Sequence, residues 1–210
     1  MEELVDQIIS KLKKEVTNLP EGFYDTFEYV TRGKNYVHPI TWGILSKILS
    51  DIEGVKYVAV DFRLNLYSND KRIKFQPDLV ALSQIEPFEP MIFLDYESPN
   101  SSDMRIPKKD VTPYEGWSKA NKSHVPYFIV TTLPNKPVKE WQLRYTTGTN
   151  SKFRGRRDEI CRNPFLFWYE EYRKILSQKD LNMIYFINID GKTVRNVTGL
   201  LQSDESLLSH

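Results

Sequence analysis

Residues 91–98 read MIFLDYES, an apolar stretch with two acids near its end. Its first four side chains are apolar on both faces of an extended chain, which is typical of a strand in the middle of a sheet. Burying a carboxylate in such a strand costs several kcal/mol unless the group is paired or binds a metal ion. The stretch therefore predicts a central strand whose acids, Asp95 and Glu97, have a specific partner.

Upstream, two alternating segments predict a β-hairpin beside this strand. Residues 55–67, VKYVAVDFRLNLY, place apolar side chains at every second position, which indicates a strand with one buried face. After a turn at residues 69–70, the segment 72–82, RIKFQPDLVAL, returns as the partner strand. Because Asp78 belongs to this second segment, we expect it to lie within a strand next to the central one.

Helices and further strands are predicted on both sides of these segments. The spacing of apolar residues predicts helices at 2–17, 39–52 and 164–177. An apolar strand is expected at 125–133, and a hairpin around Asp190-Gly191 at 183–194. The polar residues 100–123 include Pro107 and Pro113, which should confine any helix there to short pieces.

The order of these elements predicts one α/β domain with a mixed central sheet flanked by helices. A chain of 210 residues is long enough to bury one core, and it contains no internal repeat and no linker-like segment. We therefore expect a single domain over 1–200 and a frayed tail at 201–210. Within the domain, we expect an N-terminal helical and irregular extension, a core, and C-terminal strands with a helix, at 1–37, 38–133 and 134–200.

Composition excludes several classes of protein. The formal net charge is +1, so any nucleic-acid surface must be a local patch. The single cysteine, Cys161, rules out an intramolecular disulfide framework, and with three histidines it makes a structural zinc site unexpected. No apolar stretch approaches the roughly 20 residues that span a bilayer, and the N-terminus is charged and amphipathic. We expect a cytoplasmic protein.

The acids of the two predicted strands form a candidate metal site. Asp95 lies near the end of its strand, and Glu97 at i+2 projects from the same face. With Asp78 on the adjacent strand, three carboxylates come to one place, where they repel one another unless a cation binds. Carboxylate oxygens suit Mg²⁺ or Mn²⁺. The alternative is that the aspartates pair with Lys or Arg and that Glu97 is solvated, and the acid pattern alone leaves the two interpretations equal.

A lysine near such a centre would orient the attacking water or act as an electrophile. The nearest downstream candidates are Lys108 and Lys109, in RIPKKDV. Lys74 is a third candidate, because it precedes Asp78 by four residues in the same predicted strand and would share its face.

In order, five segments resemble the PD-(D/E)xK nuclease superfamily and, within it, the Uma-type branch of restriction-endonuclease-like proteins. They are HPITWGILSKIL, QPDLVAL, DYESPNSSD, KKDVTPY and VPYFIV, and together they span roughly residues 38–133. The resemblance implies metal-dependent hydrolysis of phosphodiester bonds in DNA, on a sheet flanked by helices.

Carried over residue by residue, the resemblance implies that Asp78 is the PD aspartate and Asp95 the second metal-binding acid. The backbone carbonyl of Tyr96 would be a further ligand. Glu97 stands where the superfamily usually has lysine. Some restriction enzymes of this fold also have glutamate at this position and are active. The lysine of the Uma-type branch lies downstream, which points to Lys109 or Lys108.

Other segments allow two interpretations each. His38 could lie near the metal site, as the family pattern hints, but a histidine at a helix start is more often a cap or surface residue. Residues 98–103, SPNSSD, could contact a phosphate, although a turn is the simpler interpretation. The aromatic side chains expected in the core or at a dimer face are Phe165, Phe167, Trp168, Tyr169 and Tyr172.

A basic segment, SKFRGRR at 151–157, is a candidate for contact with nucleic acid. Its cations surround Phe153, a pattern that suits phosphate contact and base stacking, although solvated basic loops are common. The candidate cations are Lys152, Arg154, Arg156 and Arg157.

The leading hypothesis from the sequence is a Mg²⁺-dependent nuclease that acts on DNA. Asp78 and Asp95 would hold the metal, and Glu97 would bind it or orient its water. A non-catalytic nucleic-acid-binding module on a nuclease scaffold is the main alternative, and a hydrolase of another phosphodiester is a third. A homodimer is plausible, because cutting both strands of a duplex takes two active sites.

Overall fold

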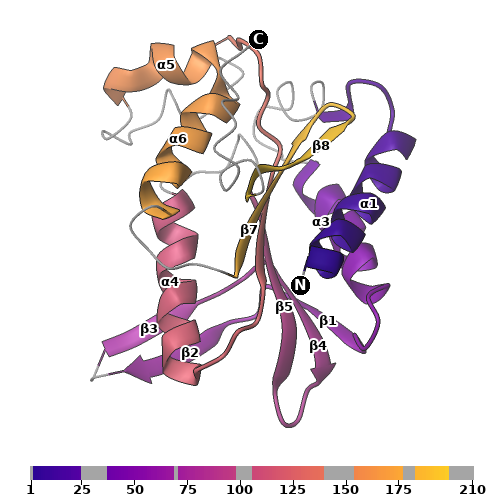
Figure 1. Cartoon of the computed structure of the whole chain (residues 1–210), viewed down its shortest axis with the longest axis vertical. Coiled ribbons are helices and arrows are strands. Elements are labelled where there is room, and N and C mark those ends of the chain that lie inside the picture. The colour runs from indigo at the N-terminus through magenta and orange to yellow at the C-terminus, as the bar shows by residue number, and fades with distance from the viewer. Residues whose placement is uncertain are drawn as a thin grey trace.

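A mixed sheet forms the middle of the protein (Figure 1). The computed structural model describes residues 2–24, 37–68, 71–97, 106–139, 154–176 and 183–198. Among these residues six strands form the main sheet, in the order β1 (Tyr57–Val60), β4 (Leu79–Gln84), β5 (Glu89–Glu97), β6 (Tyr127–Thr131), β7 (Ile184–Asp190) and β8 (Thr193–Asn196). The prediction of an α/β fold with a mixed sheet is confirmed.

Strand β5 is central, as its apolar sequence predicts. It pairs antiparallel with β4 and parallel with β6, and its residues from Ile92 to Glu97 are all buried. Because β6 and β7 are also parallel, the carboxyl ends of β5, β6 and β7 meet at one edge of the sheet. That edge is the usual place for a ligand in an open α/β sheet.

The predicted hairpin forms, but its ladder is interrupted. Val60 pairs with Leu79 in the main sheet, whereas Leu64 pairs with Phe75 in a separate sheet. In the described part of the chain this second sheet has two strands, β2 (Leu64–Ser68) and β3 (Lys71–Phe75). The register is the same on both sides of the break, because each pair of residue numbers adds to 139 (60 with 79, 64 with 75).

The break in the hairpin lies where Pro77 faces the first strand. Proline has no N–H to donate to a ladder. Across from the next residue, Asp78, the first strand bends at Asp61, which has a φ of 53°. One backbone hydrogen bond crosses here, from Asp61 N to Asp78 O at 2.8 Å. Asp78 therefore lies just before β4 and not within a strand, so that part of the prediction is wrong by one residue.

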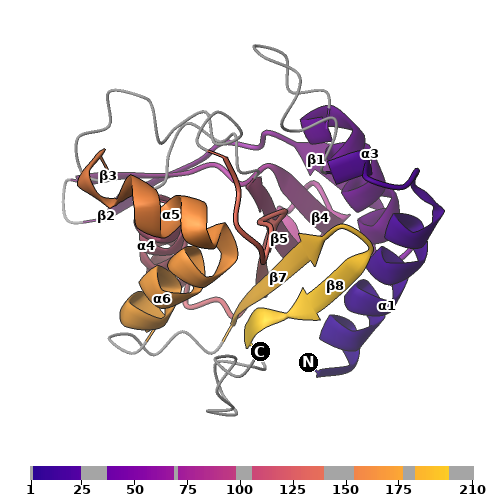
Figure 2. The same ribbon diagram turned by 90° about the horizontal axis from the view of Figure 1, so that it is seen from above.

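Helices cover both faces of the sheet (Figure 2). One face carries α1 (Glu2–Asn18) and α3 (Val37–Ser50). The opposite face carries α4 (Ile106–Asn121), α5 (Arg157–Arg162) and α6 (Pro164–Leu176). The predicted helices at 2–17, 39–52 and 164–177 are confirmed to within two residues at each end.

Alternate residues of β5 face the two helical layers. Leu94 and Tyr96 pack with the buried side chains of α1 and α3. Phe93 packs with α4 and α6, and because side chains alternate along a strand, Asp95 and Glu97 point to the same layer as Phe93. The acids thus lie beneath α4 and α6.

Helix α4 contradicts the prediction of short helical pieces between residues 100 and 123. Pro107 lies in its first turn, where a missing N–H costs nothing. Pro113 lies in its interior, at a cost of about 3 kcal/mol. The helix forms because Val111, Tyr114 and Trp117 are all buried against the sheet. Tertiary packing outweighs the local penalty.

Some predictions concern residues outside the described ranges. They include the turn at 69–70, the polar segment 98–103 and the tail at 201–210. Within the described ranges no helix has the length and apolar character that crossing a membrane would need.

The hairpin predicted around Asp190-Gly191 is confirmed as β7 and β8.

Candidate active site

Asp78 and Asp95 are held together by two reciprocal hydrogen bonds. The pairing of Leu79 with Leu94 sets Asp78 opposite Asp95. The backbone N–H of Asp78 donates to Asp95 Oδ1 at 2.7 Å. The N–H of Tyr96 donates to Asp78 Oδ2 at 2.8 Å. Each carboxylate therefore binds the strand that carries the other, and the predicted meeting of the two acids is found.

A tyrosine holds the second oxygen of Asp95. Tyr127, the first residue of β6, donates its phenolic O–H to Asp95 Oδ2. Asp95 is 6% exposed and Tyr127 is fully buried. Hydrogen bonds from two fixed donors offset much of the cost of burying this carboxylate. The sequence analysis missed Tyr127, whose only signal is its place at the start of a strand parallel to β5.

Glu97 lies two residues farther along the same face, at the carboxyl end of β5, and is 5% exposed. In residues 2–24, 37–68, 71–97, 106–139, 154–176 and 183–198, no three side chains of the His, Cys, Asp and Glu type lie close enough together to hold one metal ion. The structure thus brings Asp78 and Asp95 into contact, whereas Glu97 adjoins this pair without completing a three-carboxylate cluster. That Glu97 joins the two aspartates at one metal ion stays a prediction.

The donor set fits one class of metal ion. Mg²⁺ is commonly bound through one or two carboxylates and keeps several waters, with substrate phosphate oxygens completing its octahedron. Two carboxylates from adjacent strands meet that requirement, and the set contains neither thiolate nor imidazole. The carbonyl of Tyr96, between Asp95 and Glu97 in β5, stays a prediction as a further ligand.

The candidate lysines differ in their backbone positions. Lys108 and Lys109 lie in the first turn of α4, and their side chains are outside the described residues. Because α4 crosses over between the parallel strands β5 and β6, its first turn lies at the carboxyl end of β5. Lys74 is exposed and belongs to β3 of the second sheet. The prediction that it shares a strand with Asp78 is wrong, because the ladder breaks at Pro77.

A buried polar pair follows Glu97 across the sheet. Glu97 is in register with Thr131, and Thr131 with Asn188. Thr131 Oγ1 donates to Asn188 Oδ1 at 2.6 Å. The amide of Asn188 also pairs with Leu133, accepting from its N–H and donating to its C=O, both at 2.9 Å. These contacts fix the chain that leaves β6 beside the site.

The described part of the basic segment, residues 154–157, is helical. Arg154–Arg156 form a short 3₁₀ turn, and Arg157 begins α5. Lys152, and the side chain of Arg154, lie outside the described residues. Arg157, which is partly exposed, keeps its predicted role in DNA binding as an untested expectation.

Arg156 binds other parts of the protein. It donates to Glu159 at 2.8 Å and to Glu171 at 2.9 Å, and its guanidinium lies 4.5 Å from the ring centre of Phe167. These hydrogen bonds raise the pKa of Arg156. Its contacts join α5 to α6, which makes it a weaker candidate for DNA contact than the sequence suggests.

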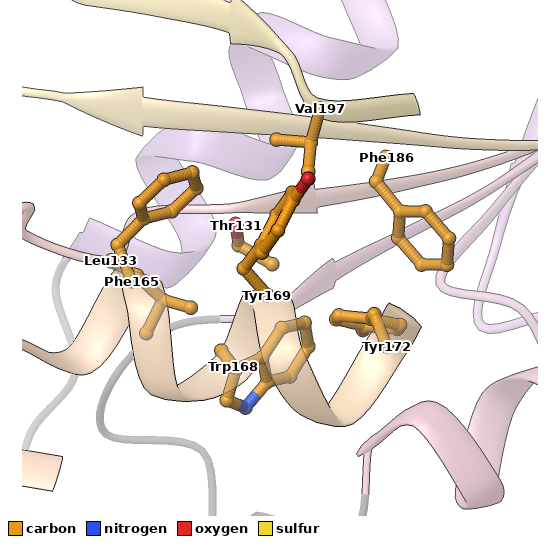
Figure 3. A pocket seen from close by; sticks show the side chains of 8 residues that line it. All are labelled: Thr131, Leu133, Phe165, Trp168, Tyr169, Tyr172, Phe186 and Val197. Carbon is orange, nitrogen blue, oxygen red and sulfur yellow. The ribbon is translucent and has the colours of Figure 1, made fainter. Parts of the chain in front are cut away.

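The aromatic residues of α6 belong to the core, as expected. Four of them, Phe165, Trp168, Tyr169 and Tyr172, line a small apolar cavity together with residues that include Phe186 of β7 and Thr131 of β6 (Figure 3). About 10 Å³ of it admits the centre of a water molecule, so it is far too small for a nucleobase. His38 lies in the first turn of α3, and its side chain is outside the described residues.

Comparison with known proteins gives no match to a protein-family model, to a curated protein or to a solved structure. The candidate site therefore rests on its own geometry. The observation that carries most weight is the interlocked pair of Asp78 and Asp95 at the carboxyl end of a central strand.

Proposed function

We propose that this protein is a metal-dependent nuclease that hydrolyses phosphodiester bonds in DNA, with Mg²⁺ or Mn²⁺ as its cofactor. The observation that supports it best is the reciprocal pairing of Asp78 with Asp95. Asp95 is buried and Asp78 is partly buried, which is costly for carboxylates, and binding a hard divalent cation is the chemistry that such a pair suits.

In this proposal Asp78 and Asp95 hold the cation, which would supply Lewis-acid stabilisation of the phosphate and a hydroxide nucleophile near neutral pH. The role of the two carboxylates is to present fixed oxygens to the cation. The N–H of Asp78 holds one oxygen of Asp95, and the N–H of Tyr96 holds one oxygen of Asp78. Their orientation is therefore set before substrate binds, which lowers the cost of assembling the site.

The remaining groups act around this pair. Glu97, buried at the end of β5, would accept a hydrogen bond from water and so orient it for attack. Lys108 or Lys109 would neutralise charge on the phosphate, since both belong to the helical turn nearest the carboxyl end of β5. The sequence resemblance adds support, because it assigns the same acids and the same two lysines.

Binding of DNA would depend on cations outside the pair of Asp78 and Asp95. A net charge of +1 means that DNA would be bound by local cations, among them Arg157 and the lysines of α4. We propose a cytoplasmic location, and a homodimer when both strands of a duplex are cut.

Supercoiled plasmid and labelled oligonucleotides, incubated with Mg²⁺, Mn²⁺ or EDTA, test this function. The wild type should nick the plasmid only with a divalent cation, and Asp95→Ala should abolish nicking. A matched control is Asp61→Asn, because Asp61 is an exposed aspartate that bonds to Gln76 at 2.5 Å instead of joining the acid pair. Cleavage that persists in EDTA or in Asp95→Ala would refute the metal–carboxylate mechanism. DNA binding without cleavage would favour the non-catalytic module.

A further inference from the structure

The phenol of Tyr127 brings a third segment of the chain, β6, into contact with the pair of Asp78 and Asp95. Tyr127 begins β6, which lies parallel to β5, and its O–H reaches back to Asp95 Oδ2. The donor to the other oxygen is the N–H of Asp78, the residue just before β4. The two oxygens of the Asp95 carboxylate therefore accept hydrogen bonds from both sides of β5.

Three contacts hold Tyr127 itself in place. Its backbone N–H donates to Met183 O at 2.8 Å. Its ring stacks on Tyr114 of α4 at 4.9 Å between centroids, and it meets Phe75 edge-on at 5.5 Å. Full burial among these rings leaves the phenol one orientation.

The neighbouring Tyr114 differs in what its hydroxyl does. It donates to Val125 O at 2.6 Å, away from the acids. Burial raises the pKa of Tyr114 to about 12, so it stays a protonated donor at neutral pH. The two stacked tyrosines are thus matched in ring packing, and only one of them touches the acid pair.

Fixed donors on both oxygens of Asp95 set the plane of its carboxylate. A carboxylate oxygen has two lone pairs, so in general it can accept a hydrogen bond and bind a cation at the same time. A carboxylate that is already oriented loses less conformational entropy when the cation binds. A residue of this kind contacts a ligand of the metal and not the metal itself. Removing such a residue typically lowers the affinity for the metal by roughly 10- to 100-fold.

We infer that Tyr127 is a positioning residue of the candidate metal centre, which orients Asp95 for a divalent cation. This inference rests on the metal site of the proposed function. A purely structural Tyr127 would contribute ring packing and one hydrogen bond to stability, and would leave the affinity for the cation unchanged.

The test compares Tyr127→Phe with the matched control Tyr114→Phe, using calorimetric titration with Mn²⁺. Each variant keeps its ring and loses one hydroxyl. We expect Tyr127→Phe to bind Mn²⁺ on the order of 10- to 100-fold more weakly, and Tyr114→Phe to stay within about threefold of the wild type. An unchanged affinity in Tyr127→Phe, or an equal loss in both variants, would overturn the inference.

Cleavage kinetics supply a second measurement. In Tyr127→Phe the Mn²⁺ concentration for half-maximal cleavage should rise by the same factor, while KM for DNA at saturating Mn²⁺ stays unchanged. A rise in KM for DNA with an unchanged Mn²⁺ requirement contradicts the positioning role.

A measurement on the wild type covers the case in which Tyr127→Phe does not fold. With tyrosine labelled by ¹³C at the hydroxyl-bearing carbon, one resonance should shift on addition of Mg²⁺ and stay still in Asp95→Asn. No such resonance would overturn the inference.

These measurements separate the two claims. A wild type that binds Mn²⁺ through Asp95, with an affinity that falls in Tyr127→Phe, but does not cut DNA would refute the proposed function and keep the inference. A wild type that cuts DNA, with Tyr127→Phe unaffected in Mn²⁺ affinity, would do the reverse.

Discussion

Asp78 and Asp95 each accept a hydrogen bond from a backbone N–H of the strand that carries the other, at distances of 2.8 Å and 2.7 Å. The two bonds act as one extra rung between β4 and β5 at the point where the ladder of β4 begins. The break at Pro77 makes this possible, because the C=O of Asp78 still accepts from Asp61 on the first strand of the hairpin while its N–H donates to Asp95. The same two acids therefore join the start of β4 to β5 and form the candidate metal site.

Replacing either aspartate with asparagine should remove activity without unfolding the protein. Asparagine keeps a side-chain oxygen that can accept the backbone N–H, but it loses the negative charge that binds the cation. We expect cleavage by Asp78→Asn and Asp95→Asn to fall on the order of a hundredfold or more. Rates of plasmid nicking measure this, beside urea unfolding curves. Variants that keep wild-type rates would refute the role of the pair.

The pairing of Asn188 with Leu133 should matter more for stability than the bond from Thr131. Asn188→Leu removes partners from both the N–H and the C=O of a buried residue. We expect a loss of about 2–4 kcal/mol in the free energy of unfolding. Thr131→Val removes one hydroxyl of nearly the same shape and should cost about 1 kcal/mol. Urea denaturation gives both values, and equal losses would contradict this assignment.

The contact between α5 and α6 should weaken in acid. Burial raises the pKa of Glu171, but hydrogen bonds from Arg156 and Lys174 outweigh it and hold the pKa below the ordinary 4.5. A lowered folded-state pKa contributes stability that is present above the unfolded value and is lost as the pH falls through the folded value.

The free energy of unfolding should therefore differ between wild type and Glu171→Gln by at most about 1 kcal/mol near neutral pH. The difference should disappear as the pH falls below about 4. Glu170→Gln is the control, since Glu170 is partly exposed and lies 3.8 Å from Arg173. Urea midpoints across this pH range measure the effect, and a gap that widens in acid would be inconsistent with it.

Lys192 should stabilise the end of α1. Its ammonium donates to the carbonyls of Val16 and Thr17 in the last turn of α1 and of Leu19 just beyond it, where carbonyls lack the regular i+4 donor of a helix. Lys192→Met should lower the free energy of unfolding by about 1–2 kcal/mol and speed amide exchange in the last turn of α1. Lys14→Met, at an exposed position of the same helix, should change neither quantity. Equal effects in the two variants would exclude this cap.

Periodicity and turn chemistry predict most of the fold. The central strand follows from MIFLDYES, and the hairpin register follows from two alternating segments. The meeting of Asp78 with Asp95 follows too, since Asp95 lies on a strand next to the one that Asp78 immediately precedes. Pattern rules fail at α4, where burial of Trp117 and its neighbours outweighs the penalty of Pro113.

Long-range partners account for the rest of what the sequence analysis missed. Asn188 lies in IYFINID at a position that alternation assigns to the buried face, so a partner is required. That partner, Leu133, is 55 residues away, and no local pattern identifies it. Tyr127 is missed for the same reason, because its hydroxyl binds an acid 32 residues earlier.

The most direct test of the metal centre is a crystal of the wild type soaked in Mn²⁺, with anomalous diffraction recorded near the manganese edge. The account predicts an anomalous peak between Asp78 and Asp95, about 2.0–2.4 Å from an oxygen of each carboxylate. It also predicts that the peak is absent in Asp95→Asn. Ordered carboxylates with no peak between them at millimolar Mn²⁺, or a peak that survives in Asp95→Asn, would contradict it.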